Sequence, residues 1–212
     1  MNSGASKSTD GYVSRYINRR FSTPITNFIV KHNIPLTPNQ VSVISFLIGA
    51  ACLPFYLLGH PIIAGILVQV SSIVDGVDGE LARILNMSSK FGAFLDAVLD
   101  RLADVLAVLG AALYLSLKMP ISPPLLAVFM LAVSGSLMVS YLHIRTQHDL
   151  GKHPMFIGKL WNLSSRDVRL FIIFLGSVTG FILHALVLVA ILANFYAIAK
   201  FLEIAYLTSK RS

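Results

Sequence analysis

The sequence predicts an all-α membrane protein with six transmembrane helices, preceded by an N-terminal amphipathic helix in the membrane interface. The chain has 212 residues, of which 55% are hydrophobic and only 13% are charged, whereas soluble domains carry about 25% charged residues. Its mean hydropathy is +0.73. Its apolar residues also fall into runs of about 20 residues, the length that crosses a bilayer. These observations exclude an ordinary water-soluble domain.

The N-terminal part is polar at first and then amphipathic. We expect residues 1–11 to form a flexible segment and residues 12–212 to form a single membrane domain. Within residues 12–33, apolar side chains recur at helical spacing and basic side chains fill much of the rest. This pattern is typical of an interfacial helix, and the alternative is a solvated amphipathic helix. We expect no cleavable signal peptide, because the first ~35 residues lack a continuous apolar core.

Six spans are expected between about residues 39 and 207. Pro38 is suited to the start of the first span, and Gly59-His60-Pro61 forms a turn before the second. The last apolar stretch is too long for one span, so we expect it to break near Thr179–His184. The expected spans cover about 39–58, 62–83, 91–116 and 123–144, with two more within 170–207.

The distribution of basic residues predicts the orientation. Six spans place both termini on one side, together with most of the Lys and Arg residues between the spans, and leave only Lys118 on the other. The basic side of a membrane protein faces the cytoplasm. We therefore expect a multi-pass cell-membrane protein with cytoplasmic termini. This orientation also accounts for the net charge of +7 without a nucleic-acid partner.

Acidic residues concentrate in one part of the chain. Six of the ten lie between positions 75 and 104, in or beside apolar spans where an ionised carboxylate is costly unless it is paired or binds a metal. They are Asp75, Asp78, Glu80, Asp96, Asp100 and Asp104.

The spacing of four of these carboxylates favours a metal site on the cytoplasmic side. Asp75 and Asp78 are three residues apart and Asp96 and Asp100 four apart, so each pair shares a helix face. A turn at residues 86–89 makes the two helices an antiparallel hairpin whose pairs face each other. Four clustered carboxylates suit two Mg²⁺ ions, or Mn²⁺, about 4 Å apart.

The neighbouring residues favour a phosphate ligand. Gly79, Ala82 and Gly92 leave room beside the acidic face, and Arg83 offers a forked donor for phosphate. Three other interpretations remain: structural ion pairs with Arg83, Arg101 and Lys90, cation or proton transport, and a non-catalytic scaffold. Transport would require a polar path across the membrane, and segments such as Leu106–Leu117 are apolar.

The acidic segment resembles the signature of the CDP-alcohol phosphotransferase (CDP-alcohol phosphatidyltransferase) family. The run Asp75-Gly-Val-Asp78-Gly79-Glu-Leu-Ala82-Arg83, followed by Gly92, Asp96 and Asp100, has all eight fixed positions at the family's spacing. The resemblance implies that Asp75, Asp78 and Asp96 hold one metal ion and that Asp75, Asp96 and Asp100 hold a second. It also implies that Asp100 is the general base. The implied CDP-binding residues are Pro38, Asn39, Asp75, Asp78, Gly79, Ala82, Arg83, Ser89 and Gly92.

Basic residues near the connection between the fourth and fifth spans are candidates for the acceptor's phosphate. They are Arg145, Lys152, Arg166 and Arg169. Arg166 and Arg169 can converge on one anion, because they are three residues apart. The alternative is a loop that is basic only because it faces the cytoplasm.

The N-terminal segment and the Asp-Gly-Val-Asp-Gly-Glu run are similar to the membrane domain of archaeal and thermophile di-myo-inositol phosphate phosphate synthases. This resemblance implies CDP-inositol as the donor, inositol 1-phosphate as the acceptor and CMP as the leaving product. The alternative is a phospholipid synthase that uses CDP-diacylglycerol with inositol phosphate or glycerol phosphate. A homodimer in contact with membrane lipids is also expected from the family.

Overall fold

The computed structural model describes residues 11–160 and 162–210, and this part of the chain is helical without strands. The predicted flexible segment 1–11 lies outside the described residues except for Gly11. A π-helical turn at Ser14–Asn18 leads into α1. The helices are α1 (Arg19–Lys31), α2 (Pro38–Ala50), α3 (Cys52–Leu57), α4 (Pro61–Ile84), α5 (Lys90–Lys118), α6 (Pro123–Leu150), α7 (Arg166–Thr179) and α8 (Ile182–Ser209).

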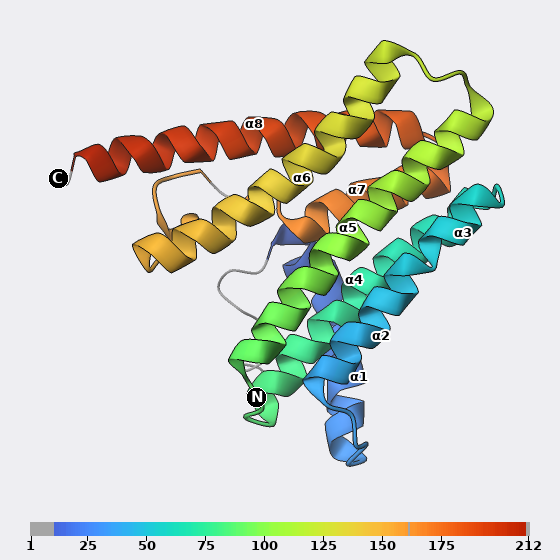
Figure 1. Ribbon diagram of the computed structural model, residues 1–212. Helices are drawn as coiled ribbons and strands as arrows, with labels where there is room; N and C mark the ends of the chain where they lie inside the picture. The colour runs from blue at the N-terminus through green and yellow to red at the C-terminus, as the bar shows by residue number, and fades with distance from the viewer. Residues whose placement is uncertain (1–10, 161, 211–212) are drawn as a thin grey trace.

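The helices form two groups that meet at α7 (Figure 1). In one group α2 packs along α4, α5 packs against α2 and α3, and α1 packs against α4. In the other group α6 packs along α8, and α7 contacts both α4 and α8. Small residues allow close approach: a Cβ atom on Gly110 of α5 would lie 2.5 Å from the ring of the buried Tyr56.

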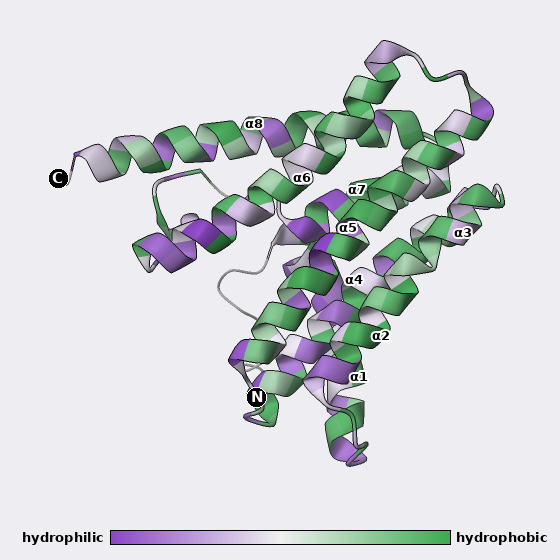
Figure 2. Ribbon diagram, in the orientation of Figure 1, coloured by the Kyte–Doolittle hydropathy of each residue, from purple (hydrophilic) through white to green (hydrophobic). Residues whose placement is uncertain are grey.

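Four segments are long and apolar enough to cross a membrane: residues 38–57, formed by α2 and α3, and helices α4, α6 and α8. The first turns of α5 carry several charged side chains, and α7 has only 14 residues. Figure 2 shows hydrophobic residues along most of the helices and hydrophilic ones gathered near the α4–α5 turn and the start of α7. Hydrophilic residues also lie at the end of α6 and on α1, so the polar residues gather toward the ends of an otherwise apolar set of helices (Figure 2).

Helix boundaries differ from the expected ones in three places. The first span bends at Ala51 between α2 and α3, because Pro54 has no N–H to donate to the carbonyl four residues earlier. Helix α6 continues to Leu150, so Arg145 lies on a helix. Helix α7 begins at Arg166, before the expected residue 170. The break between α7 and α8 lies at Gly180, whose φ of +82° suits glycine, and falls within the expected window.

An ion pair that the sequence does not reveal joins α1 to α4. The carboxylate of Glu80 is fully buried and accepts hydrogen bonds from Arg19 Nη1 at 2.6 Å and Ser22 Oγ at 2.7 Å. Glu80 follows Gly79 in the acidic segment, so this contact ties the N-terminal helix to the helix that carries the first two aspartates.

Replacement of Arg19 by methionine is expected to destabilise the protein by about 3–5 kcal/mol, because it leaves Glu80 as an uncompensated buried charge. Unfolding of the detergent-purified protein by denaturant measures this change. Arg20→Met is the matched control, since Arg20 is exposed on the same helix. Equal stability of the two variants would show that the Arg19–Glu80 pair contributes nothing to the docking of α1.

Candidate functional site

The α4–α5 hairpin brings the acidic residues together as predicted. Asn86 has a φ of +54° in the turn between the helices, a conformation that asparagine tolerates better than most residues. Ser89 then caps α5, because its Oγ accepts a hydrogen bond from the N–H of Gly92 at 2.9 Å. One carboxylate oxygen from each of Asp75, Asp78 and Asp96 lies within 4.8 Å of the other two.

The donor set fits a divalent cation. Three converging carboxylates supply hard oxygen ligands of the kind that Mg²⁺ and Mn²⁺ prefer. Asp78 is held in place by the Oγ of Ser42 on α2, which donates a hydrogen bond to its carboxylate. The residues predicted to hold a first ion are therefore assembled in one place.

Asp100 lies in a different environment from these three carboxylates. Arg166 Nη1 lies 2.8 Å from Asp75 Oδ2 and 3.1 Å from Asp100 Oδ1, so its guanidinium bridges the two carboxylates. Arg101 Nη1 also lies 3.3 Å from Asp100. A second ion held by Asp75, Asp96 and Asp100 would require the Arg166 guanidinium to move out of this bridge.

Asp104 is a part of the site that the sequence analysis left out of its predicted residues. Its buried carboxylate accepts hydrogen bonds from Arg166 Nε at 2.9 Å and from Arg169 Nη2 at 3.1 Å. Arg169 is itself buried and also donates to the carbonyl of Ser164. The available signal was the position of Asp104, which is four residues after Asp100 and therefore on the same helix face.

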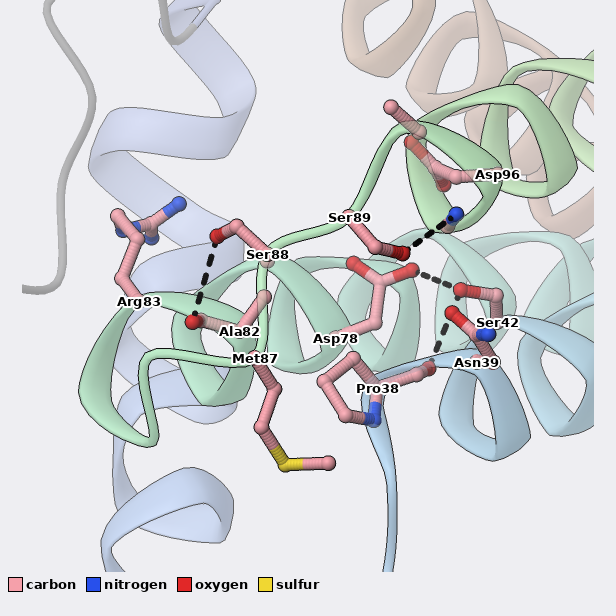
Figure 3. Close-up of a pocket in the computed structure, with 13 residues that line it drawn as sticks. Pro38, Asn39, Ser42, Asp78, Ala82, Arg83, Met87, Ser88, Ser89 and Asp96 are labelled. Carbon is pink, nitrogen blue, oxygen red and sulfur yellow. Dashed lines mark hydrogen bonds between the residues drawn. The ribbon is translucent and has the colours of Figure 1, made fainter.

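A cavity of about 180 Å³ opens beside the carboxylates (Figure 3). All of the predicted CDP-binding residues except Asp75 line it, together with Ser42, Met87, Ser88, Ala93 and Asp96. Glycine at position 92 allows close approach, because a Cβ atom there would lie 2.8 Å from the Oδ1 of Asn39 and 3.0 Å from the Oγ of Ser89. The start of α2 and the α4–α5 hairpin thus form one pocket, which we call the hairpin pocket.

A second polar cavity, of about 270 Å³, also borders the acidic residues. It shares Asp78, Gly79, Arg83 and Asp96 with the hairpin pocket, and we call it the polar pocket. Two of the carboxylates, Asp78 and Asp96, therefore line both cavities, while Asp75 and Asp100 line only the polar pocket. The other lining residues come from η1, α1, α4 to α7 and nearby segments: Gly11, Ser14, Asn18, Arg19, Ser72, Asp75, Gly76, Asp100, His143, His153, Asn162, Ser165, Arg166 and Asp167.

Two histidines in the polar pocket were not predicted as site residues. The rings of His143 and His153 lie 5.1 Å apart between centroids, and His143 Nε2 is 3.3 Å from the hydroxyl of Tyr196. Burial, and then the charge of Lys200, lower the pKa of His153 below its ordinary value. Its imidazole is therefore neutral at pH 7 and offers one donor and one acceptor.

Two further polar groups line this pocket without a protein partner among the described residues. The Oδ1 of Asn162 and the Oγ of Ser165 are buried and make no hydrogen bond within that part of the chain. Buried polar atoms are normally hydrogen-bonded, so these two atoms are suited to a polar ligand in the pocket.

The four basic residues predicted for the acceptor are not all near this pocket. Arg166 lines it and Arg169 supports Arg166 through Asp104. Arg145 is exposed on α6 and pairs with Asp149 at 2.8 Å, and Lys152 is exposed after the end of α6. Neither Arg145 nor Lys152 lines the hairpin pocket or the polar pocket.

Comparison with known proteins relates the whole helical region to one group of enzymes. Residues 35–199 match the family model described as CDP-alcohol phosphatidyltransferase. The bifunctional IPC transferase and DIPP synthase of Aquifex aeolicus is 36% identical over 87% of this chain and 42% of its own length. The protein of the same description from Rubrobacter xylanophilus is 40% identical over 94% of this chain and 44% of its own length. The chain thus spans less than half the length of these relatives.

Shorter relatives and solved structures agree with this match. Archaetidylinositol phosphate synthase of Pyrococcus horikoshii is 35% identical over 76% of this chain and 79% of its own length. The crystal structure of Mycobacterium tuberculosis phosphatidylinositol phosphate synthase with CDP-DAG bound has the same fold, with a TM-score of 0.72, 22% identity, and coverage of 87% of this chain and 94% of that chain. The same enzyme has also been solved in complex with manganese and citrate, and that structure gives a TM-score of 0.71 at 21% identity, covering 87% of this chain and 88% of that chain.

Proposed function

Because the chain belongs to the CDP-alcohol phosphatidyltransferase family, we propose that it transfers the phosphoinositol group of CDP-inositol to inositol 1-phosphate. The products would be di-myo-inositol phosphate phosphate and CMP. As a family member the protein is a membrane transferase of phosphate-containing groups. The observation that carries the proposal is that the acidic cluster borders two cavities, with Asp78 and Asp96 lining both, and that each cavity is large enough to hold part of a substrate.

The hairpin pocket is assigned to the CDP part of the donor. Asn39 and Ser89 provide polar atoms for the nucleotide, and Arg83 lies where the pocket meets the carboxylates. Asp75, Asp78 and Asp96 would hold a divalent cation, which neutralises the donor's pyrophosphate when it is bound. The related Mycobacterium tuberculosis enzyme has been solved with CDP-DAG and with manganese, which is consistent with both assignments.

The polar pocket is assigned to the acceptor. A polyol phosphate needs one cationic group and several hydrogen-bonding groups, and this pocket contains Arg166 together with His143, His153, Asn162 and Ser165. Arg166 would bind the acceptor's phosphate while Asp104, itself held by Arg169, accepts a hydrogen bond from Arg166 Nε. Among the described lining residues, this pocket offers few apolar side chains for an acyl chain.

The reaction we propose is a direct displacement at phosphorus. Asp100 accepts the proton of the acceptor hydroxyl as its oxygen attacks the phosphorus distal to cytidine. The bond from that phosphorus to the bridging oxygen breaks, and CMP leaves with its charge stabilised by Arg83. A carboxylate is a weak base at pH 7, so most of the rate enhancement must come from positioning of the two substrates.

We propose the membrane arrangement that the sequence predicts. We infer that α2–α3, α4, α5, α6, α7 and α8 form six spans and that the N-terminal helix lies in the cytoplasmic interface. Its exposed apolar residues support this placement: Tyr12, Tyr16, Phe21, Ile25 and Phe28. Both termini and both pockets would then face the cytoplasm, where nucleotide donors are available. A homodimer is expected as in the family.

A phospholipid synthase is the second candidate. It is favoured by the match to archaetidylinositol phosphate synthase, which this chain covers over 79% of that enzyme's length. In this alternative the residues of the polar pocket stay the same, and the donor is a CDP-activated lipid whose chains lie in the bilayer. With inositol phosphate as the acceptor the two candidates differ only in the donor, and with glycerol phosphate they differ in the acceptor as well.

A CMP-release assay on the purified protein distinguishes these functions. It combines CDP-inositol and CDP-diacylglycerol, each with inositol 1-phosphate, inositol, glycerol 3-phosphate and serine, in the presence of Mg²⁺. The proposal requires CMP release with CDP-inositol and inositol 1-phosphate. Release with CDP-diacylglycerol alone would replace it by the phospholipid synthase, and release with none of the pairs would refute both.

Metal removal is expected to abolish this activity. Dialysis against EDTA should eliminate CMP release, and Mg²⁺ or Mn²⁺ should restore it, because repulsion among the carboxylates and the pyrophosphate is otherwise uncompensated. Isothermal titration with Mn²⁺ measures binding independently of activity. Asp78→Asn should weaken this binding more than tenfold, while Asp149→Asn, an exposed aspartate on α6, should not. Full activity in EDTA would contradict a metal-dependent mechanism.

A further inference from the structure

A fully buried lysine on α8 has no place in the mechanism described above. The side chain of Lys200 has no exposed surface, and its Nζ donates to the carbonyls of Ile157 at 2.5 Å and Leu160 at 3.0 Å. It also lies 2.7 Å from the Oε2 of Glu203, one turn further along α8. All three donor positions of the ammonium group are thus directed at acceptors.

Glu203 binds the same segment as Lys200, but as a hydrogen-bond acceptor instead of a donor. Its Oε1 accepts hydrogen bonds from the backbone N–H of Lys159 at 2.5 Å and of Leu160 at 3.2 Å. The two side chains therefore bind both carbonyls and N–H groups of residues 157–160. We call Lys200, Glu203 and this segment the α8 clamp.

Glycine at position 158 allows this approach. Its φ is +77°, and a Cβ atom there would lie 2.2 Å from the Cδ and the Oε1 of Glu203. Any other residue would be strained in the backbone and would collide with the carboxylate. The segment and the side chain of Glu203 are therefore fitted to each other.

The clamp holds a connection that has little regular structure. Between α6 and α7, the described residues contain only one 3-10 turn, Pro154–Phe156. Backbone groups in such a segment require partners outside it, and here α8 supplies several of them. Figure 1 shows the connection lying beside α8. The same connection continues directly into Asn162, Ser165 and Arg166 of the polar pocket.

Stability alone does not account for a charged clamp. Buried ion pairs often contribute no more stability than well-packed apolar residues of similar size, because both charges must be desolvated. A lysine that binds two carbonyls of a loop and a carboxylate on its own helix does, however, fix the position of that loop relative to the helix. Fixing the loop also fixes the groups that follow it, at a site where a displacement of about 1 Å is costly.

We propose that Lys200 and Glu203 are positioning residues for the acceptor: the α8 clamp sets the wall of the polar pocket without touching the substrate. This inference rests on the assignment of the polar pocket to the acceptor. It predicts that loosening the clamp impairs use of the acceptor and leaves use of the CDP donor unchanged, because the hairpin pocket is built from α2, α4 and α5.

The test compares Lys200→Met and Glu203→Gln with Lys210→Met, a control at the exposed end of the same helix. KM for acceptor and donor is measured by CMP release. We expect Lys200→Met to raise the acceptor KM about tenfold, as for the loss of a substrate hydrogen bond, with the donor KM unchanged. Glu203→Gln retains an oxygen acceptor for the two N–H groups and should have a smaller effect.

A second measurement does not depend on activity. Lys152 and Lys159 are exposed in the connection, so limited digestion with trypsin reports its opening. Cleavage after these residues should be about tenfold faster in Lys200→Met than in Lys210→Met, following the equilibrium population of the open segment. If Lys200→Met does not fold, Gly158→Ala tests the same contact from the loop side.

Three outcomes decide the inference. Faster cleavage together with a raised acceptor KM supports it. Cleavage and acceptor KM equal to those of Lys210→Met would overturn it, and so would a parallel rise in both KM values, which indicates a general loss of structure. If the wild-type protein releases no CMP with any substrate pair, the proposed function fails, while the digestion still shows whether the clamp holds the connection.

Discussion

Asp100→Asn is expected to reduce CMP release by about 10²–10⁴-fold, the usual contribution of a general base. Asparagine keeps the size of the side chain but cannot accept the proton of the attacking hydroxyl. It also removes the negative charge that pairs with Arg166 at 3.1 Å. The measurement is kcat at saturating concentrations of both substrates in Mg²⁺.

The effect should be confined to the chemical step. Asp100 does not line the hairpin pocket, so the affinity for CDP, measured by titration calorimetry, should change less than threefold. Asp149→Asn serves as the control, because Asp149 pairs with Arg145 on the surface of α6. A kcat for Asp100→Asn within tenfold of the wild type would exclude Asp100 as the general base. The rate enhancement would then be attributed to positioning of the two substrates.

Arg166→Gln is expected to weaken both the stability of the protein and the binding of the acceptor. Arg166 bridges Asp75, Asp100 and Asp104. Its loss leaves these carboxylates to repel one another, which should lower the free energy of unfolding by about 3–5 kcal/mol. Mn²⁺ should recover much of this loss, because a divalent cation takes over the neutralisation.

Unfolding with and without Mn²⁺ measures this dependence, and the acceptor KM measures binding in the same variant. Arg145→Gln is the matched control, since Arg145 is an exposed arginine outside both pockets. It should keep the stability and the acceptor KM of the wild type. If Mn²⁺ stabilised Arg166→Gln and the wild type equally, Arg166 and the metal would not be neutralising the same carboxylates.

The acidic hairpin was predictable because its information is local. Helical spacing placed Asp75 beside Asp78 and Asp96 beside Asp100, and the short segment between the helices brought the pairs together. The hairpin pocket followed from the family signature, which lies almost entirely within this hairpin. Local signals also located the break between the last two helices, where Gly180 adopts a positive φ.

The polar pocket was not predictable, because its groups come from distant segments. His143 lies on α6 and His153 on the connection after it, and both lie more than 40 residues beyond Asp100 in the sequence. Their spacing in the sequence resembles no ligand motif, and only the packing of α6 and α7 brings them to the carboxylates. The Arg19–Glu80 pair is similar, since 61 residues separate its partners.

Arg166 shows that a charge pattern in the sequence can predict that two side chains converge on an anion without predicting which anion it is. Its spacing from Arg169 predicted convergence on one anion, and the two side chains do converge, on Asp104. The sequence gives no indication that this anion is a carboxylate of α5, because the contact depends on where α7 begins and how it packs. Arg145 and Lys152 were selected by the same charge pattern and lie on the surface.

The residues shared by the two pockets have a consequence for the order of chemical events. Asp78, Gly79, Arg83 and Asp96 border both cavities, so the proposed assignment places donor and acceptor beside the same residues at the same time. Under this assignment the group moves between them in a single displacement, without a phosphorylated side chain on the way. We then expect inversion of configuration at a phosphorus made chiral by isotopes, and no exchange of labelled CMP into the donor until an acceptor has entered.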